Sequence, residues 1–138
     1  MKFLDRLHPL ALLALRLALG AIMIAHGMQK VSGGMPKFMG MLQNMGIPPI
    51  MAYLVVAAEL GGGILLVLGL LTRLAALSIV IDMCVAIAKV HFKNGLKGPG
   101  GYEFPMMCGV VAFALIFLGA GPISLDEAFF HGGGSSRK

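Results

Sequence analysis

Residues 51–90 read MAYLVVAAELGGGILLVLGLLTRLAALSIVIDMCVAIAKV, two long apolar runs joined by the dipeptide Thr72-Arg73. A helix needs about 20 mostly apolar residues to cross the roughly 30 Å hydrocarbon core of a bilayer. The runs 51–71 and 74–90 come close to that length and show no alternation of apolar and polar residues. Helices, which satisfy their own backbone groups in lipid, are therefore expected rather than barrel strands.

Two further apolar windows, 10–28 and 104–121, complete a predicted set of four spans. Charged residues make up 12% of the 138-residue chain, against about 25% in soluble domains. A soluble domain of this size could not bury so much apolar surface, which excludes a water-soluble enzyme. We expect an all-α, polytopic membrane protein, a four-transmembrane-helix bundle in a single domain of residues 1–131. Residues 132–138, GGGSSRK, are predicted to be a flexible tail.

The first long connection is predicted to contain a short helix over residues 36–45. Pro36 suits a first helical position, and Phe38, Met41, Leu42 and Met45 recur at helical spacing on one face. Ten residues cannot span a bilayer, so this interfacial or re-entrant helix should cover the mouth of the bundle.

The lengths of the connections predict the sidedness. We call the side of the Thr72-Arg73 turn side A; both termini should share it, and both long loops should lie on the opposite side B. Five Lys and Arg residues fall on each side, so the positive-inside rule gives a tie. Because Lys30 and Lys89 look partly intramembrane, side A is expected to be cytoplasmic, in a prokaryotic inner membrane. Side A offers only a short turn, and no second polar mouth is expected there.

Several ionisable residues fall inside the predicted spans, where a charge costs about 2.5–3.5 kcal/mol on insertion scales. They are Arg16, His26, Glu59, Asp82 and Lys89, with Lys30, His91 and Glu103 at helix ends. Arg16 matches the depth of Asp82 best and could reach Glu59 by stretching, so one guanidinium has two candidate carboxylates. The others gather toward side B and predict a pocket that opens there above a polar floor. The alternatives are purely structural ion pairs and snorkelling lysines.

The sequence contains no motif for a metal or cofactor of the protein's own. His26 and His91 are only two possible metal ligands, and Cys84 and Cys108 form no CxxC pair. Eleven methionines raise soft-metal binding as an alternative, but they follow apolar stripes and are expected to be core filler. The glycine-rich segments lack the strand–turn–helix context of dinucleotide binding. The basic residues are scattered singly, which argues against a nucleic-acid partner.

With these residues assembled, the chain resembles the DoxX family of small four-helix membrane proteins, related to the DoxD-like subunits of archaeal quinone-linked oxidoreductases. The matching elements are Leu15-Arg16-Leu17 with Gly20, His26-Gly27-Met28-Gln29-Lys30, Gly46-Ile47-Pro48, Glu59-Leu60-Gly61-Gly62, Gly69-Leu70-Leu71-Thr72-Arg73, Ala86-Ile87 with His91 and Gly95, Gly101-Tyr102-Glu103-Phe104, and Gly119 through Ser124-Leu125-Asp126. They cover residues 12–127. Asp82 and the methionine excess belong to no family pattern.

The resemblance implies quinone or thiol redox chemistry, oxidative or electrophile stress defence, and membrane complexes with soluble redox partners. Our leading hypothesis is a pocket for a quinone-like or other amphipathic small molecule, serving a redox complex or stress defence. The candidate ligand-binding and polar residues are Arg16, His26, Lys30, Glu59, Asp82, His91, Tyr102 and Glu103. No catalytic residue is assigned. A bound quinone is the expected cofactor, and the lipid bilayer, a soluble redox partner and a second copy in a homodimer are the expected partners. The alternatives are a small-molecule or lipid transporter and a non-catalytic membrane anchor for a soluble oxidoreductase.

Overall fold

The structure is a computed structural model that describes residues 2–131, with side chains described from residue 4 onward. Every regular element among these residues is helical, which confirms the all-helical prediction. After a single turn, α1 (Lys2–Asp5), the long helices begin with α2 (His8–Ser32). Three helices are long and apolar enough to cross a membrane: His8–Ser32, Met51–Leu68 and Thr72–Asn94. The fourth apolar helix, α7 (Glu103–Leu118), has 16 residues and a length of about 24 Å, so the four-span count stays a prediction.

Two of the spanning helices change their winding partway along. The second consists of α4 (Met51–Val56), the π-helical turn η1 (Ala57–Gly61) and α5 (Gly62–Leu68). The third consists of α6 (Thr72–Ala86), the π-helical turn η2 (Ile87–His91) and the 3-10 turn η3 (Phe92–Asn94). It runs four residues beyond the predicted end. The apolar run stops at Val90, but the helical backbone continues through residues 91–94 as far as Gly95, whose φ of +76° ends it.

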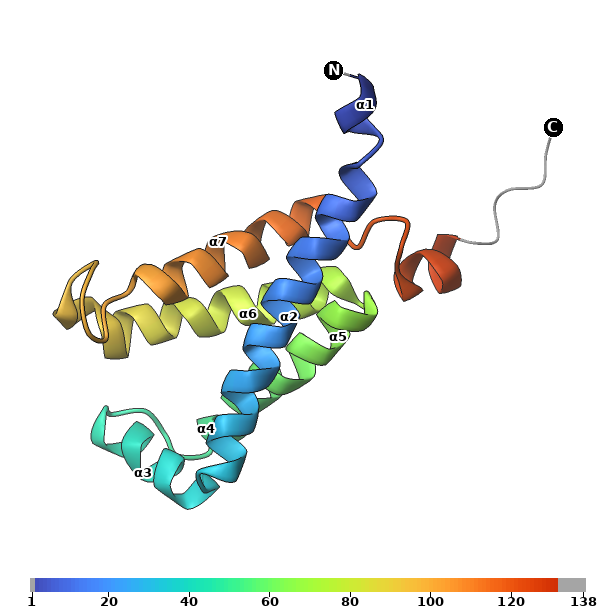
Figure 1. The fold of residues 1–138 in the computed structure, drawn as a ribbon. Coiled ribbons are helices and arrows are strands. Elements are labelled where there is room, and N and C mark those ends of the chain that lie inside the picture. Colours follow the sequence, from blue (N-terminus) through green and yellow to red (C-terminus); the bar gives the residue numbers. More distant parts are fainter. Residues whose placement is uncertain (1, 132–138) are drawn as a thin grey trace.

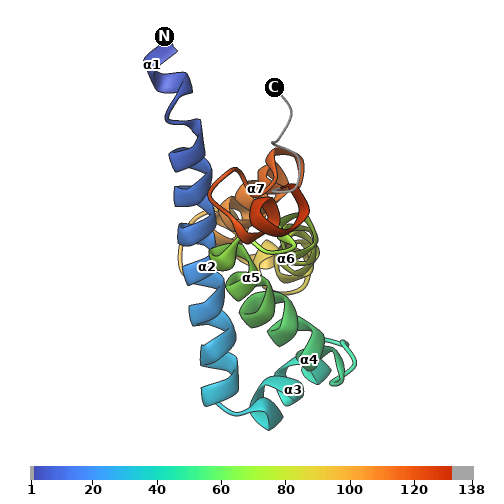
Figure 2. The same ribbon diagram turned by 90° about the vertical axis from the view of Figure 1, so that its right-hand side faces the viewer.

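The short helix predicted in the first long loop is α3 (Met35–Asn44). Its Phe38 and Leu42 are buried with Ala52 in a small second core, as the apolar stripe predicted. Gly34, at a φ of +98°, separates α3 from α2, and Gly46, at +74°, follows its end. The helix therefore folds back beneath α2 and α4 (Figures 1 and 2).

The helices pair as two antiparallel hairpins. In the first, α2 packs against η1 and α5 at very close range: a Cβ added to Gly20 would lie 2.8 Å from the Gly63 carbonyl oxygen, and one added to Gly27 would lie 2.8 Å from the Leu60 nitrogen. Small residues commonly allow this approach in membranes, where van der Waals packing drives association. In the second hairpin α6 packs along α7, and Arg73 donates to the Ile116 carbonyl at 2.9 Å.

The two hairpins of the predicted helix bundle cross rather than lie alongside one another. Figure 2 looks along α6 and α7 while α2 runs from top to bottom. The corner is the turn after α5, where Gly69 and Leu71 are both left-handed, with φ of +67° and +48°. Helices tilt by up to about 40° from the bilayer normal, so a wide crossing requires opposite tilts of the two pairs. The main core, which includes Leu19, Leu66 and Ile79, lies at the crossing.

Candidate functional site

A cavity of about 230 Å³ lies on the side B half of the molecule, between α2, α3, η1, α6, η2 and the start of α7. Its ionisable lining residues are His26, Lys30, Glu59, Asp82, Lys89 and His91. Five of the eight candidate residues from the sequence therefore share one cavity, together with Lys89. The remaining walls are mostly apolar and include Phe38 and Leu42 of α3, so the short helix covers this cavity.

An ion pair joins two sides of the cavity. Lys30 Nζ lies 2.7 Å from Glu59 Oε1 and 2.6 Å from Oε2, so it donates to both carboxylate oxygens. The side chain of Glu59 is 6% exposed and that of Lys30 is 22% exposed. Lys30 Nζ also lies 5.5 Å from the centroid of the Phe38 ring, a cation–π distance. The pair therefore joins α2 to η1 under the cover of α3.

The π-helical turns place three of the ionisable lining groups, Glu59, Lys89 and His91. Glu59 lies in η1 and His91 ends η2, and π-turns inside α-helices are frequent at functional sites. An inserted residue changes the phase of the helix, so these side chains do not lie where a regular 100° rotation per residue would put them.

The two histidines have different partners. The His26 ring stacks on Phe104, with centroids 5.5 Å apart. His91 Nδ1 lies 2.8 Å from the Gly100 carbonyl oxygen. Because a carbonyl only accepts, Nδ1 carries the hydrogen, and in the neutral ring Nε2 is left as an acceptor. Neutral His91 can thus accept a hydrogen bond from a ligand hydroxyl.

Asp82 provides an acceptor that no protein group uses. Its Oδ2 atom is buried and has no hydrogen-bond partner among residues 2–131. Buried polar atoms usually have one, and a lost partner costs about 1–3 kcal/mol. Because Asp82 lines the cavity, a ligand hydroxyl or N–H there would satisfy this oxygen.

Arg16 lies outside the cavity, and the prediction that it holds Glu59 or Asp82 is wrong. Its side chain is 1% exposed and donates to four backbone carbonyls. These belong to Leu66 at 3.0 Å, Val67 at 3.3 Å, Ala120 at 2.6 Å and Ile123 at 2.7 Å. The reason is the register of the antiparallel pair: Arg16 lies opposite the last turn of α5, about 10 Å of helix rise away from Glu59. A guanidinium there stabilises the carbonyl end of α5, where the helix dipole favours a positive charge.

Tyr102 and Glu103 also lie outside the cavity lining. Tyr102 stacks on Phe92 with ring centroids 5.9 Å apart. Glu103 is exposed as the first residue of α7, where the helix dipole favours a carboxylate. Both therefore belong to the second long loop and its junction with α7.

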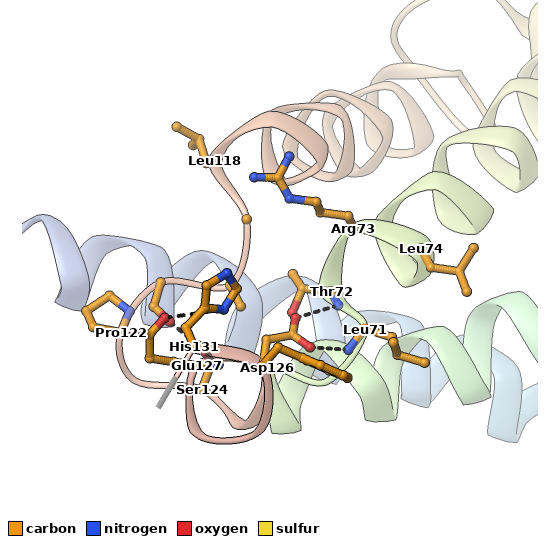
Figure 3. A pocket seen from close by; sticks show the side chains of 14 residues that line it. Leu71, Thr72, Arg73, Leu74, Leu118, Pro122, Ser124, Asp126, Glu127 and His131 are labelled. Carbon is orange, nitrogen blue, oxygen red and sulfur yellow. Dashed lines mark hydrogen bonds and ion pairs between the residues drawn. The ribbon is translucent and has the colours of Figure 1, made fainter. Parts of the chain in front are cut away.

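Side A carries a second depression, of about 580 Å³, that our sequence analysis did not predict. It is lined by polar residues that include Thr72, Arg73 and Asp126 (Figure 3). Asp126 Oδ1 accepts from the Leu71 N–H at 2.6 Å and Oδ2 accepts from the Thr72 N–H at 2.9 Å, so Asp126 caps α6. The expectation that side A has no second polar mouth is therefore wrong. The Ser124-Leu125-Asp126 segment was the sequence feature that could have indicated this depression. Its Asp126 binds backbone N–H groups, which the sequence does not reveal.

Among residues 2–131, no group of three or more His, Cys, Asp or Glu side chains is placed to hold a metal ion. Cys108 is buried and Cys84 is exposed, and both are free thiols. The polar chemistry of the cavity is therefore that of an ion pair, two imidazoles, a second lysine and one unpartnered carboxylate oxygen.

The comparisons with known proteins agree with the resemblance. The chain is 31% identical over 120 residues to "Putative oxidoreductase CatD" of Bacillus subtilis, and the match covers 87% of each chain. It is 32% identical over 138 residues to a protein of Haemophilus influenzae, with 94% of this chain and 98% of that one covered. It is 30% identical over 134 residues to "Uncharacterized membrane protein Rv3486" of Mycobacterium tuberculosis, with 86% and 81% covered. No solved structure matches. The sequence profile of the DoxX family matches residues 11–92, and the chain belongs to this family.

Proposed function

We propose that the side B cavity binds the polar head of a quinone-like amphipathic molecule and that the protein serves a membrane redox complex or oxidative stress defence. The observation that carries this proposal is the Lys30–Glu59 pair in the wall of an open cavity with mostly apolar walls, which also contains a carboxylate oxygen that has no partner among the described residues. Sites for small molecules typically combine apolar walls with a few convergent polar groups.

The residues of the cavity fit such a head group. Lys30 can donate to a ring carbonyl, while Asp82 Oδ2 and neutral His91 Nε2 can accept from ring hydroxyls. The Glu59 carboxylate, which accepts from the ammonium group that faces it, can also accept a hydrogen bond from a ring hydroxyl. The stacked His26 and Phe104 offer a flat surface for a ring. A bound quinone supplies two-electron, two-proton redox chemistry, for which these groups provide both donors and acceptors.

The name of the Bacillus subtilis relative, "Putative oxidoreductase CatD", supports a redox context. Within the proposal, electrons come from a soluble redox partner that docks on the membrane protein. We further propose that side A faces the cytoplasm in a prokaryotic inner membrane, and that a homodimer is the working unit.

Binding is favoured over transport by the packing between the two polar regions. Along α6, Ala75, Ala76 and Ile79 lie between Thr72 and Asp82, and all three are at most 2% exposed. A transported molecule would have to separate this part of the core. An anchor without a ligand would have no use for the unpartnered Asp82 oxygen.

The test measures saturable binding of a tailless dimethoxy-benzoquinone to the protein in lipid nanodiscs, by equilibrium dialysis against empty nanodiscs. Glu59→Gln should weaken binding at least tenfold, because it removes the carboxylate that positions Lys30. Glu103→Gln is the matched control, since Glu103 is exposed outside the cavity, and it should bind like the wild type.

Two results would count against the proposal. One is the absence of saturable binding to the wild-type protein, and the other is equal binding by the wild type and Glu59→Gln. Co-purification of a soluble oxidoreductase that survives alanine replacement of His26, Glu59 and His91, without quinone binding, would instead favour the anchor.

A further inference from the structure

A second apolar space, a groove of about 730 Å³, runs between the α4–η1–α5 helix and α6. Ser78 and Asp82 supply the only polar side chains of its lining. Ser78 Oγ already donates to the Ala75 carbonyl of its own helix at 2.7 Å. Apart from Asp82, the groove therefore presents hydrocarbon throughout.

The groove opens sideways rather than toward either loop side alone. Leu54, Leu74 and Ile81, which line it, are 64%, 61% and 58% exposed. These residues belong to Met51–Leu68 and Thr72–Asn94, two of the helices long enough to cross a membrane. Residues at these positions face the lipid, so a molecule dissolved in the bilayer can reach the groove without leaving hydrocarbon.

The groove adjoins the side B cavity, with which it shares five lining residues. Leu42, Ile47, Val55, Asp82 and Val85 line both spaces. The unpartnered Oδ2 atom belongs to one of these shared residues, so the polar space meets the apolar space at Asp82.

The volumes of the two spaces differ in a way that suggests their occupant. The cavity, about 230 Å³, is smaller than the roughly 300–1,000 Å³ of typical ligand sites, so it has room for a head group and little more. The groove, about 730 Å³, adds the apolar volume that a chain attached to that head would need.

We propose that the groove holds the hydrocarbon tail of the same membrane-soluble quinone whose head lies in the cavity, and that this ligand enters laterally from the bilayer. This inference rests on the proposed function. The occupant is the ligand's own tail, rather than a free lipid chain, because the groove ends at the polar cavity and shares five lining residues with it.

A tail that moves from lipid into the groove gains little from the hydrophobic effect, because lipid chains are equally apolar. The sensitive measurement is therefore the effect of blocking the groove on a tailed probe and on a tailless probe. Gly61 is suited to this, since it lines the groove and a Cβ built on it meets nothing within 4 Å. A side chain placed there projects into the open groove.

The experiment uses the full chain in phosphatidylcholine nanodiscs, with a decyl-substituted benzoquinone and the same quinone without a tail. Gly61→Phe should weaken binding of the tailed probe at least tenfold and leave the tailless probe unchanged. Ile81→Trp, on the opposite wall and away from Glu59, should act in the same direction. Gly40→Phe on α3 is the control, because Gly40 also faces open space but lines neither the cavity nor the groove.

A quinone that carries a diazirine along its tail should also label residues of the groove, and unlabelled tailed quinone should compete with this labelling. If Gly61→Phe and Ile81→Trp leave tailed binding intact while Glu59→Gln removes it, the tail lies elsewhere and only the proposed function stands. If labelling persists under competition, bulk lipid fills the groove and the inference falls. It also falls if Gly61→Phe turns a dimer into a monomer. If neither probe binds the wild type, the proposed function itself fails.

Discussion

Replacing Arg16 should lower the stability of the protein and leave ligand binding unchanged. This outcome is expected if Arg16 binds backbone carbonyls, as in the structure, and not if it binds Glu59 or Asp82, as the sequence suggested. In Arg16→Met the apolar stem is kept and the donors to the four carbonyls are lost. The Leu66 carbonyl keeps the Gly69 N–H at 3.1 Å, and the Val67 contact is long at 3.3 Å. The loss therefore falls mainly on the carbonyls of Ala120 and Ile123.

The magnitude follows from these two short bonds, at 2.6 and 2.7 Å from Nη1. A hydrogen bond to a charged group contributes about 1.5–3 kcal/mol, so Arg16→Met should lower the free energy of unfolding by about 3–6 kcal/mol. That is a large part of the roughly 5–15 kcal/mol by which a domain is stable. The free energy of unfolding of Arg16→Lys should lie between those of the wild type and Arg16→Met, because an ammonium group lacks the planar fork that reaches two chain segments.

The chain offers its own reporter for this measurement. Cys108 is buried at 4% exposure and Cys84 is exposed, so in a Cys84→Ser background a thiol-reactive fluorophore reports the unfolding of α7. Thermal or denaturant titration of detergent-solubilised protein with this dye gives the stability of each variant.

A double-mutant cycle with Glu59→Gln supplies the refutation. The two residues share no partner, so their effects on stability should add within about 0.5 kcal/mol. A coupling above roughly 1 kcal/mol, or quinone binding that falls in folded Arg16→Met as it does in Glu59→Gln, would show that Arg16 supports the carboxylates after all.

Three further predictions concern the side A ends of α2, α5 and α6, near Arg16, and the same thiol assay checks each of them. Asp126→Ala should destabilise the protein by about 1–2 kcal/mol, the usual loss for a helix cap, because α6 loses both capping bonds; an unchanged midpoint would contradict this assignment. Thr72→Val should be neutral or stabilising, since the buried Thr72 hydroxyl oxygen has no partner, and a marked loss would reveal a hidden one. Gly20→Ala should cost about 1–3 kcal/mol by pushing α2 away from Gly63, whereas Gly61→Ala, which meets open space, is its control and should not destabilise.

The apolar pattern predicted the helices well because whether a segment forms a helix depends mainly on the residues of that segment. The run 51–71 formed a helix only as far as Leu68. The corner lies at residues 69–71, and Thr72 and Arg73, which we predicted as the turn, begin α6. The stripe around Phe38 became α3. The crossing of the hairpins was not predictable in this way. It depends on two left-handed residues at the corner, and one of them, Leu71, carries a side chain that gives no sign of this conformation.

The sequence predicted the positions of polar residues that interact with other side chains, and it missed those that form hydrogen bonds with the backbone. His26, Lys30, Glu59, Lys89 and His91 line one cavity, as their depth predicted. Asp82 lines it too, although its depth matched that of Arg16, and Glu103 does not line it. Arg16 did not join them, because the carbonyls that bind it carry no signal in the sequence. The specific pairing of Lys30 with Glu59 also depends on η1, whose extra residue per turn changes which face Glu59 occupies.

The division of polar groups between the two sides is the reason that we propose ligand binding on side B. An unpaired backbone group costs several kcal/mol in lipid, so helix ends within the membrane need side-chain partners. On side A that need is met by Arg16, which binds carbonyls, and by Asp126, which binds N–H groups. On side B Lys30 and Glu59 bind one another, and Asp82 Oδ2 has neither a backbone nor a side-chain partner. The polar side chains of side A thus stabilise the fold, whereas side B keeps a hydrogen-bond acceptor that is available to the proposed ligand.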